Sequence, residues 1–271
     1  MSVHPRFPFR AKPAWGSSLA AVMLIVMAPA TAVAATITLF QNDFEAPTGI
    51  LIPSGCCSDA TQQTVNSLFG TAFDQTFTVE TLAINGPAEV YSDPSGIGGN
   101  YALGMLTSEQ NDLLSLTFDT TGLGFVNLGW DIAAVGIDQP VGAPITATFL
   151  TGASSYRLTL YDTPGGTFSF ASLGTYTVLD SKTVTGTDPL PGGLTFDWLR
   201  QVVALNASGQ TDNQVTLVID QIAGGYGAFD NLVIAASTEA GDLPGVVPEP
   251  STLLLLGTGL ALATRSRRRR R

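Results

Sequence analysis

Between residues 36 and 236 the chain alternates apolar and polar side chains with a period of two. Leu114, Leu116 and Phe118 alternate with polar residues, and the same pattern recurs over 156–161 and 215–220. Alternation of this kind predicts β-strands with one buried face. Further runs of β-branched and aromatic residues predict strands at 36–41, 76–84, 125–132, 175–184 and 229–235.

Turns rich in glycine and proline separate these runs, as at Asp93–Gly96, Thr163–Gly166, Pro191–Gly193 and Ala207–Gly209. No part of this stretch has the spacing and capping residues of a convincing amphipathic helix. About ten to twelve short strands in a region of this length predict an all-β fold. We expect one domain, an antiparallel β-sandwich of the jelly-roll type, over residues 35–236.

The first 34 residues have a different pattern. Three basic residues precede an unbroken apolar run from Leu19 to Ala28, and Ala32-Val33-Ala34 then supplies small residues at the positions that a signal peptidase recognises. The apolar run is shorter than the roughly 20 residues of a membrane span. Residues 1–34 are therefore predicted to be a signal peptide that is cleaved after Ala34, and an uncleaved anchor is the alternative.

The C-terminal residues, 247–271, combine three elements. Val247-Pro248-Glu249-Pro250 is stiff and extended, because each proline fixes its own φ and restricts the residue before it. An apolar stretch from Leu253 to Ala263 follows, and six arginines end the chain. A helix over 251–264 would be about 21 Å long, which is marginal against a hydrocarbon core about 30 Å thick. The arginines predict that this end stays in the cytoplasm.

This order of motif, short apolar helix and arginine cluster closely resembles the PEP-CTERM sorting tail. The resemblance implies export by a Gram-negative bacterium, anchoring in the inner membrane, and processing by an exosortase-type enzyme that would recognise Val247, Pro248, Glu249 and Pro250. It also implies a final location at the cell surface or in the extracellular polysaccharide matrix. Residues 237–246 are predicted to link this tail to the sandwich. An ordinary tail anchor behind a proline-rich linker is the alternative.

Charge narrows the set of partners. Only Arg157, Lys182 and Arg200 are basic between the two ends, against 21 acidic residues, so this region carries a net charge near -18. Such a surface repels nucleic acid phosphates, which argues against a DNA or RNA partner, and it suits hard cations. The only histidine, His4, precedes the apolar run. Ser–His and Cys–His nucleophile pairs and His-ligated zinc are therefore excluded for the sandwich.

Cys56 and Cys57 are adjacent in the sequence. Neighbouring cysteines rarely pair with each other, because a disulfide needs a Cα separation that an ordinary trans dipeptide does not provide. Two thiols in a loop are one interpretation, and an intermolecular or strained vicinal disulfide is the other.

The two ends of the predicted sandwich carry acidic residues. The first strand leads into Asp43-Phe44-Glu45, and the last contains Asp230-Asn231 before an apolar run. This pairing resembles carbohydrate-binding-module-like and concanavalin-like jelly rolls, in which a structural calcium often lies between the termini. The resemblance implies Glu45 and Asp230 as the best calcium ligands, with Asp43 next. The alternative is that Asp230-Asn231 only turns the chain into its last strand.

Sugar binding would require an exposed aromatic ring, and Tyr226, between glycines, is the predicted candidate. Trp130 and Trp198 lie in alternating runs and are predicted to be core residues. Glycoside hydrolysis needs two carboxylates about 5–10 Å apart, and no glycosidase signature is present. We therefore expect a non-enzymatic surface or extracellular-matrix protein. A carbohydrate-binding module for exopolysaccharide is the second hypothesis, and a glycoside hydrolase is the third.

Overall fold

The computed structural model describes residues 35–48, 57–58, 62–76, 79–84, 91–106, 112–135, 152–191 and 194–244. Within them, twelve strands form two antiparallel sheets. One sheet contains β1 (Thr36–Asn42), β2 (Cys57–Ser58), β4 (Glu80–Ala83), β5 (Tyr101–Leu106), β7 (Phe125–Val135), β10 (Leu199–Asn206) and β12 (Tyr226–Ser237). The other contains β3 (Asp74–Gln75), β6 (Leu113–Asp119), β8 (Ser155–Asp162), β9 (Thr177–Thr185) and β11 (Gln214–Ala223).

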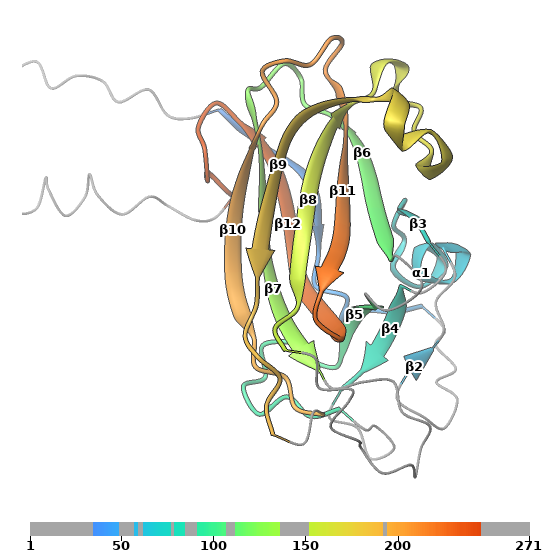
Figure 1. Ribbon diagram of the computed structural model, residues 1–271, viewed down its shortest axis with the longest axis vertical. Coiled ribbons are helices and arrows are strands. Elements are labelled where there is room, and N and C mark those ends of the chain that lie inside the picture. The colour runs from blue at the N-terminus through green and yellow to red at the C-terminus, as the bar shows by residue number, and fades with distance from the viewer. Residues whose placement is uncertain are drawn as a thin grey trace, which may run out of the picture. The chain divides into compact units, whose positions relative to one another are not determined.

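The seven-stranded sheet has the order β10-β7-β12-β5-β4-β2, with β1 also paired to β12, and the five-stranded sheet has the order β3-β6-β11-β8-β9. The two sheets pack face to face (Figure 1). This arrangement is the jelly-roll β-sandwich that the alternating sequence predicts. Two short 3-10 helices, η2 (Pro164–Gly166) and η3 (Phe170–Thr175), lie between β8 and β9.

The core lies between the sheets, because each alternating strand turns its apolar residues inward. Trp130 of β7 is fully buried, and its ring lies 4.9 Å from that of Tyr156 in β8 and 5.5 Å from that of Phe229 in β12. Burying an aromatic side chain of this kind contributes about 2–3 kcal/mol to stability. The prediction that Trp130 is a core residue is confirmed.

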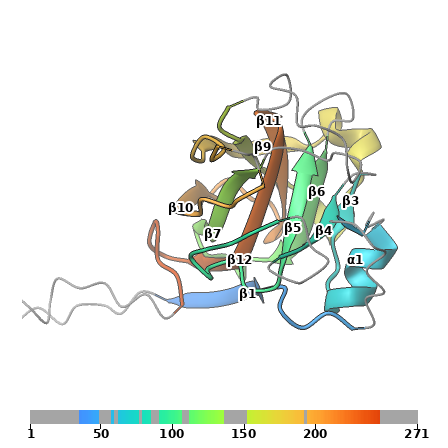
Figure 2. The same cartoon turned by 90° about the horizontal axis from the view of Figure 1, so that it is seen from below.

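One helix, α1 (Gln62–Phe69), lies beside β3 where the sequence analysis expected no helix (Figure 2). Its Val65 and Leu68 are buried, and Phe69 packs against the core. The helix has no acidic residue in its first turn and no basic residue in its last, so the sequence gives little indication of where it begins and ends. The expectation was wrong because packing of one apolar stripe stabilises this short helix.

Strand β12 positions the candidate site, because it changes partner along its length. Its first residues, 226–229, pair with β5, and 232–237 pair with β1. On its other side it pairs with β7, with a register shift between Asp230 and Val233. Asp230 and Asn231 thus lie where the pairing changes, and irregularities of this type re-aim side chains.

The segment after β12 stays attached to the outer face of the seven-stranded sheet, the face turned away from the other sheet. The buried Asn127 donates from Nδ2 to the carbonyl oxygens of Glu239 and Asp242, and its Oδ1 accepts from the Gly241 N–H. Leu243 is buried. The predicted linker 237–246 therefore begins as the end of β12 and follows the sandwich as far as Leu243.

Several predictions concern parts of the chain outside the described residues. They are the signal peptide 1–34, residues 245–246, the tail 247–271 with its apolar helix, and Cys56. For Cys57 only the backbone, in β2, is described. Among the described helices, none has the length and apolarity required to cross a bilayer.

Candidate functional site

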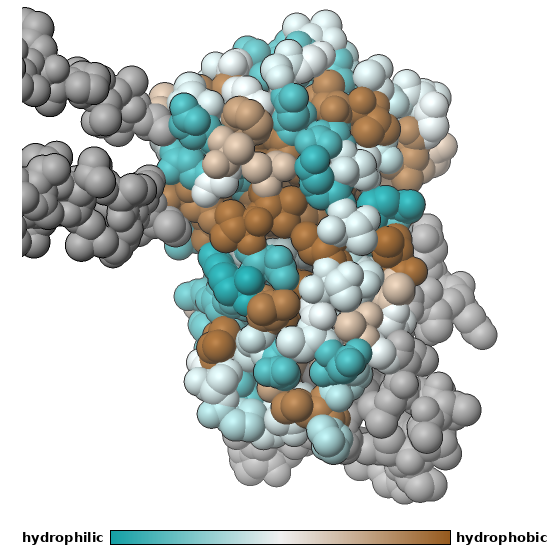
Figure 3. Space-filling view, turned by 60° about the vertical axis from the view of Figure 1, so that its left-hand side comes forward, coloured by the Kyte–Doolittle hydropathy of each residue, from teal (hydrophilic) through white to brown (hydrophobic). Residues whose placement is uncertain are grey.

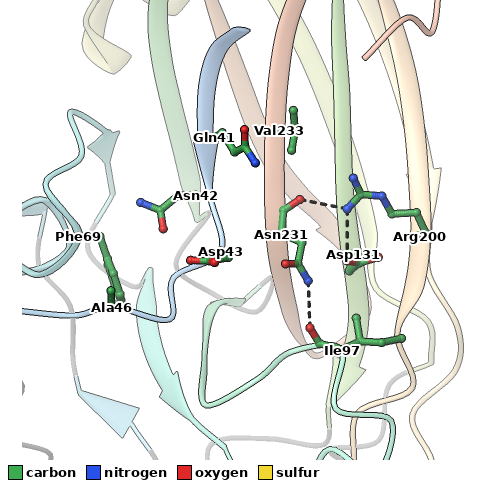
Figure 4. A pocket seen from close by; sticks show the side chains of 10 residues that line it. All are labelled: Gln41, Asn42, Asp43, Ala46, Phe69, Ile97, Asp131, Arg200, Asn231 and Val233. Atoms are coloured by element: carbon green, nitrogen blue, oxygen red, sulfur yellow. Dashed lines mark hydrogen bonds and ion pairs between the residues drawn. The ribbon is translucent and has the colours of Figure 1, made fainter. Parts of the chain in front are cut away.

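A groove of about 730 Å³ crosses the outer face of the seven-stranded sheet (Figure 4). It spans β1, β12, β7 and β10, three inter-strand steps that together measure about 14 Å. Phe69 and Ala46 lie at one end of the groove and Arg200 at the other. The lining mixes polar and apolar side chains: Gln41, Asn42, Asp43, Ala46, Phe69, Ile97, Asp131, Arg200, Asn231 and Val233.

Arg200 of β10 and Asp131 of β7 form the charged end of the groove. They are a cross-strand pair, in which Nη1 of Arg200 lies 3.2 Å from Oδ2 of Asp131. The same nitrogen donates to the Asn231 carbonyl at 3.0 Å. The arginine side chain is nevertheless 43% exposed. Gly129 gives the guanidinium room on the sheet, because a Cβ there would lie 3.0 Å from Nη2.

Asn231 turns the chain beside this pair. Its backbone is left-handed, with φ of 49°, a conformation that asparagine tolerates better than most residues. Its side-chain amide donates to the Ile97 carbonyl at 3.0 Å, which ties β12 to the 91–100 loop. Ile97, 44% exposed, lies across the groove from Val233 (Figure 4).

Phe44 holds the acidic end of β1 in place. Its φ is 53°, which a bulky residue rarely adopts, and tight packing imposes it. The ring is fully buried and meets those of Phe69 and Phe229 edge-on, at 5.3 and 6.3 Å. Asp43 and Glu45, on either side of Phe44 in the sequence, are thereby fixed relative to the sheet.

Glu45 joins the end of β1 to the start of β5. Its Oε1 accepts from the N–H groups of Asn100 and Tyr101 at 2.8 and 3.1 Å, and its Oε2 accepts from Asn100 Nδ2 at 2.8 Å. Gly99 makes this approach possible, because a Cβ there would overlap the carboxylate and its φ of 52° also favours glycine.

Asp230 is the most deeply buried carboxyl group of the site, with 1% of the residue exposed. Burial raises its pKa to about 8, because removal from water disfavours the charged form. A hydrogen bond from the Asn231 N–H opposes this shift, whereas the charges of Glu45, Asp131 and Asp43 add to it. Without a cation beside it, this carboxyl keeps its proton at neutral pH.

Asp43 and Glu45 lie close enough to Asp230 for their charges to act on its carboxyl group. Among the described residues, however, no group of three or more Asp, Glu, His or Cys side chains is arranged to hold a metal ion. Glu45 uses both oxygens on Asn100 and Tyr101. Asp230 fits a cation best, because its buried carboxyl has negative neighbours and one backbone hydrogen bond.

The expectation of an exposed ring at Tyr226 is wrong. The residue is the first of β12 and is fully buried in an apolar cluster with Tyr91 and Phe196. Its hydroxyl lies against Gly104 of β5, where a Cβ would overlap it. The flanking glycines suggested a loop, but Gly227 belongs to β12, where it makes room for the Tyr156 hydroxyl. Tyr226 therefore cannot present a surface to a sugar.

Sequence reasoning did not find Arg200 and Asp131 as site residues. The available signal was that Arg200 is one of three basic residues in the sandwich and lies in an alternating run. Its partner could not be identified, because that requires the register between β10 and β7.

The surroundings of the groove combine apolar and polar surface. The molecule seen from the side of β10 shows hydrophobic residues among hydrophilic ones across the described surface (Figure 3). Val202 of β10 is 49% exposed. Apolar surface beside a few fixed polar groups is the usual composition of small-ligand sites.

Comparison with protein families assigns the end of the chain. The model described as the PEP-CTERM protein-sorting motif matches residues 246–271. This segment is a PEP-CTERM sorting motif. The motif indicates a secreted protein that is anchored in the membrane before processing, which confirms the predicted export and anchoring. The final location stays a prediction.

No curated protein matches the chain. Solved structures that resemble it include the CBM22-1 xylan-binding domain of Paenibacillus barcinonensis Xyn10C, with 12% identity over 77% of this chain and 99% of that one and a TM-score of 0.37. The K3 cleaved adhesin domain of Lys-gingipain from Porphyromonas gingivalis has 12% identity over 74% and 99%, with a TM-score of 0.37. At such TM-scores these likenesses carry no inference about the groove.

Proposed function

We propose that the chain is an exported, non-enzymatic protein of the cell surface or extracellular matrix, and that its groove binds neutral polysaccharide. The observation that carries this proposal is the fixed arrangement of Arg200, Asp131 and Asn231 in an open groove with apolar walls. A sugar presents the same combination, with hydroxyl groups at its edge and C–H groups on its faces.

The polar groups at the charged end suit hydroxyl groups. Arg200 uses Nη1 on Asp131 and on the Asn231 carbonyl, and its 43% exposed side chain leaves donors directed to solvent. Gln41 and Asp43 are exposed on β1 and just after it, and they can donate and accept from the other side. Because the protein itself fixes the arginine and the asparagine, little side-chain entropy is lost on binding.

The apolar groups suit the faces of sugar rings. Phe69, Ile97 and Val233 line the groove on different sides of its polar centre (Figure 4). With a width of about 14 Å across four strands, the groove accommodates a short stretch of a polysaccharide rather than a single monosaccharide.

Electrostatics favours a neutral polymer. Arg200 is already paired with Asp131, and Asp43 and Glu45 add negative charge nearby. A uronate or sulfate group entering this groove would meet net repulsion. The predicted charge of the whole sandwich acts in the same direction.

The roles of the carboxyl groups support binding without cleavage. Hydrolysis requires one carboxylic acid and one carboxylate, both in contact with the scissile bond. Asp131 is held by Arg200, Glu45 by Asn100 and Tyr101, and Asp230 is buried. We therefore assign no catalytic role to these residues.

Export follows from the sorting motif, and delivery to the matrix is part of the proposal. An exosortase-type enzyme would process the tail at Val247-Pro248-Glu249-Pro250. The sandwich would then remain outside the cell and hold polysaccharide.

A structural calcium at Asp230 is a second part of the proposal. Calcium accepts carboxylate and main-chain carbonyl oxygens, so Asp230 and Asp43 could bind it together with carbonyl groups, while Glu45 keeps its hydrogen bonds. A bound calcium would compensate the charge of Asp230 and fix the junction of β1, β5 and β12.

An array of immobilised polysaccharides tests the binding function. Retention on neutral polymers such as xylan, galactan or glucomannan, with no retention on polyuronates and no release of reducing ends, is the expected result. Absence of retention on every polymer would reject polysaccharide binding. Release of reducing ends would indicate a glycoside hydrolase instead.

A further inference from the structure

Four aromatic residues form a separate cluster on the five-stranded sheet. Tyr161 belongs to β8, and Phe168, Phe170 and Tyr176 come from the connection between β8 and β9. Phe168 stacks on Tyr176, with centroids 5.2 Å apart and an interplanar angle of 27°, and Phe170 meets Phe168 edge-on at 5.3 Å. Tyr161 lies 6.3 Å from Phe168 and 6.4 Å from Tyr176. All four are half-buried, so part of each remains at the surface.

This aromatic cluster lies on the outer face of its sheet. Leu158 and Leu160 of β8 are core residues, so the alternation turns Tyr161 outward. Its cross-strand neighbour, Val178 of β9, is 53% exposed. The groove described above is on the outer face of the other sheet. The two features are therefore on opposite sides of the sandwich, with the core between them.

A pocket of about 210 Å³ adjoins the aromatic cluster, between β3 and the start of η3. Phe168 and Phe170 line it together with Asp74, Gln75, Ser169 and Ala171. Asp74 and Ser169 are exposed and provide a polar rim. Aromatic rings beside carboxylate and hydroxyl groups can bind a pyranose, because its C–H face packs on a ring while its hydroxyl groups bind at the rim.

Charge identifies the occupant of this second face. One basic residue, Arg157, lies on this face, and it is in an ion pair with Asp220. An anionic polymer or an anionic lipid surface would meet Asp220 and Asp74 without a compensating excess of positive charge. A neutral polysaccharide would meet no such repulsion and could still stack on the rings.

We propose that the aromatic cluster is a second polysaccharide-binding site and that one molecule holds two polysaccharide chains, one on each side of the sandwich. This inference rests on the proposed function, because the groove would hold the first chain. A protein with two such sites can cross-link two polysaccharide chains. Once one site is bound, the polymer network is at a high effective concentration near the other site, and this strengthens attachment.

A two-step capture experiment tests the proposal with the full-length chain purified in mild detergent. The chain is first captured on an immobilised neutral polymer, either xylan, galactan or glucomannan. A fluorescent soluble form of the same polymer is then added. The wild type is expected to retain the fluorescent polymer. The double variant Phe168→Leu/Tyr176→Leu should be captured within about twofold of the wild type through the groove, but retain at least about tenfold less fluorescent polymer.

Two controls separate stacking from folding. Tyr176→Phe keeps the ring and loses only the hydrogen bond from its hydroxyl to the Thr167 carbonyl. This variant should therefore retain as much fluorescent polymer as the wild type. The stoichiometry of a short oligosaccharide, measured by calorimetry on the wild type, needs no variant and should be two per chain. A stoichiometry of one would overturn the proposal even if the leucine variant does not fold.

The possible failures are distinguishable. If no polymer captures the wild type, the proposed function fails and this inference fails with it. If the wild type is captured but retains no fluorescent polymer, the second binding site is overturned and the proposed function of the groove stands. If recruitment persists in the leucine variant, the aromatic cluster is not the second site, and a second copy of the chain or another surface holds the polymer.

Discussion

Asp230 of β12 and Asp131 of β7 lie directly opposite each other in neighbouring antiparallel strands. Two carboxyl groups thus share one small area of the outer face, and Arg200 pairs with Asp131. Asp230 is buried beside them and has a pKa raised to about 8. One carboxylate therefore orients the arginine, and burial raises the pKa of the other carboxyl group.

The raised pKa of Asp230 predicts that the calcium-free protein loses stability as pH rises. The group titrates near 3.8 when unfolded and near 8 when folded, so between these values only the folded state keeps the proton. The free energy of unfolding therefore falls, by up to a few kcal/mol, from about pH 4 to about pH 8. Thermal melts in chelator across this range measure the effect, and Asp230→Asn should flatten it.

Calcium should act against this loss, because a cation replaces the proton on Asp230. Added calcium is expected to raise the melting temperature more at pH 8 than at pH 5, and to have little effect on Asp230→Asn. Identical melting temperatures at pH 8 with calcium and with chelator would rule out the structural calcium.

Gly99 and Gly96 form a matched pair for testing the role of Glu45. Both have positive φ, 52° and 70°, but only at Gly99 would a Cβ overlap the Glu45 carboxylate, whereas Gly96 has open space. Gly96→Ala should cost about 1 kcal/mol from the backbone alone. Gly99→Ala should cost at least about 2 kcal/mol more, because it displaces three hydrogen bonds of a partly buried carboxylate. Equal losses in urea denaturation would contradict the structural role given to Glu45.

Asn127 is predicted to hold the segment that leads to the sorting motif. Asn127→Ala removes three hydrogen bonds from residues 239–242, so Gly241 should lose amide protection in hydrogen exchange and stability should fall by about 2–3 kcal/mol. The exposed Asn206, whose side chain accepts from the N–H and hydroxyl of Ser208, is the matched control. Unchanged exchange at Gly241 would show that other contacts, such as those of Leu243 and of Asp242 with Ser237, keep the segment in place.

The sorting motif makes a prediction about location. Replacing both Pro248 and Glu249 with alanine should prevent processing, so that the full-length chain accumulates in the membrane fraction of the producing cell. The control Glu239→Ala changes one acidic residue outside the motif and should leave processing intact. Release of both variants into the medium at equal rates would contradict recognition of this motif.

The sandwich could be predicted because alternation places residues on one face without knowledge of the topology. Leu114, Leu116 and Phe118 all lie in the core as their spacing indicates. The site could be predicted only in part. The resemblance of the two ends of the fold implied Asp43, Glu45 and Asp230 as calcium ligands, and this stays a prediction. The Arg200–Asp131 pair depends on a strand register that no local pattern encodes. Tyr226 was misassigned because local glycines do not reveal that β12 begins there.

The most direct test of the central claim is the affinity of the chain for a neutral polysaccharide before and after Arg200→Ala. Lys182→Ala is the control, because Lys182 belongs to β9 in the other sheet and lies outside the groove. Its ammonium group pairs with the carboxylate of Asp180, two residues away in the same strand, at 3.5 Å. Calorimetry with soluble xylan, galactan or glucomannan should show affinity lost by about tenfold or more in Arg200→Ala and kept in Lys182→Ala. Equal affinity in both variants would contradict the assignment of the groove as the polysaccharide site.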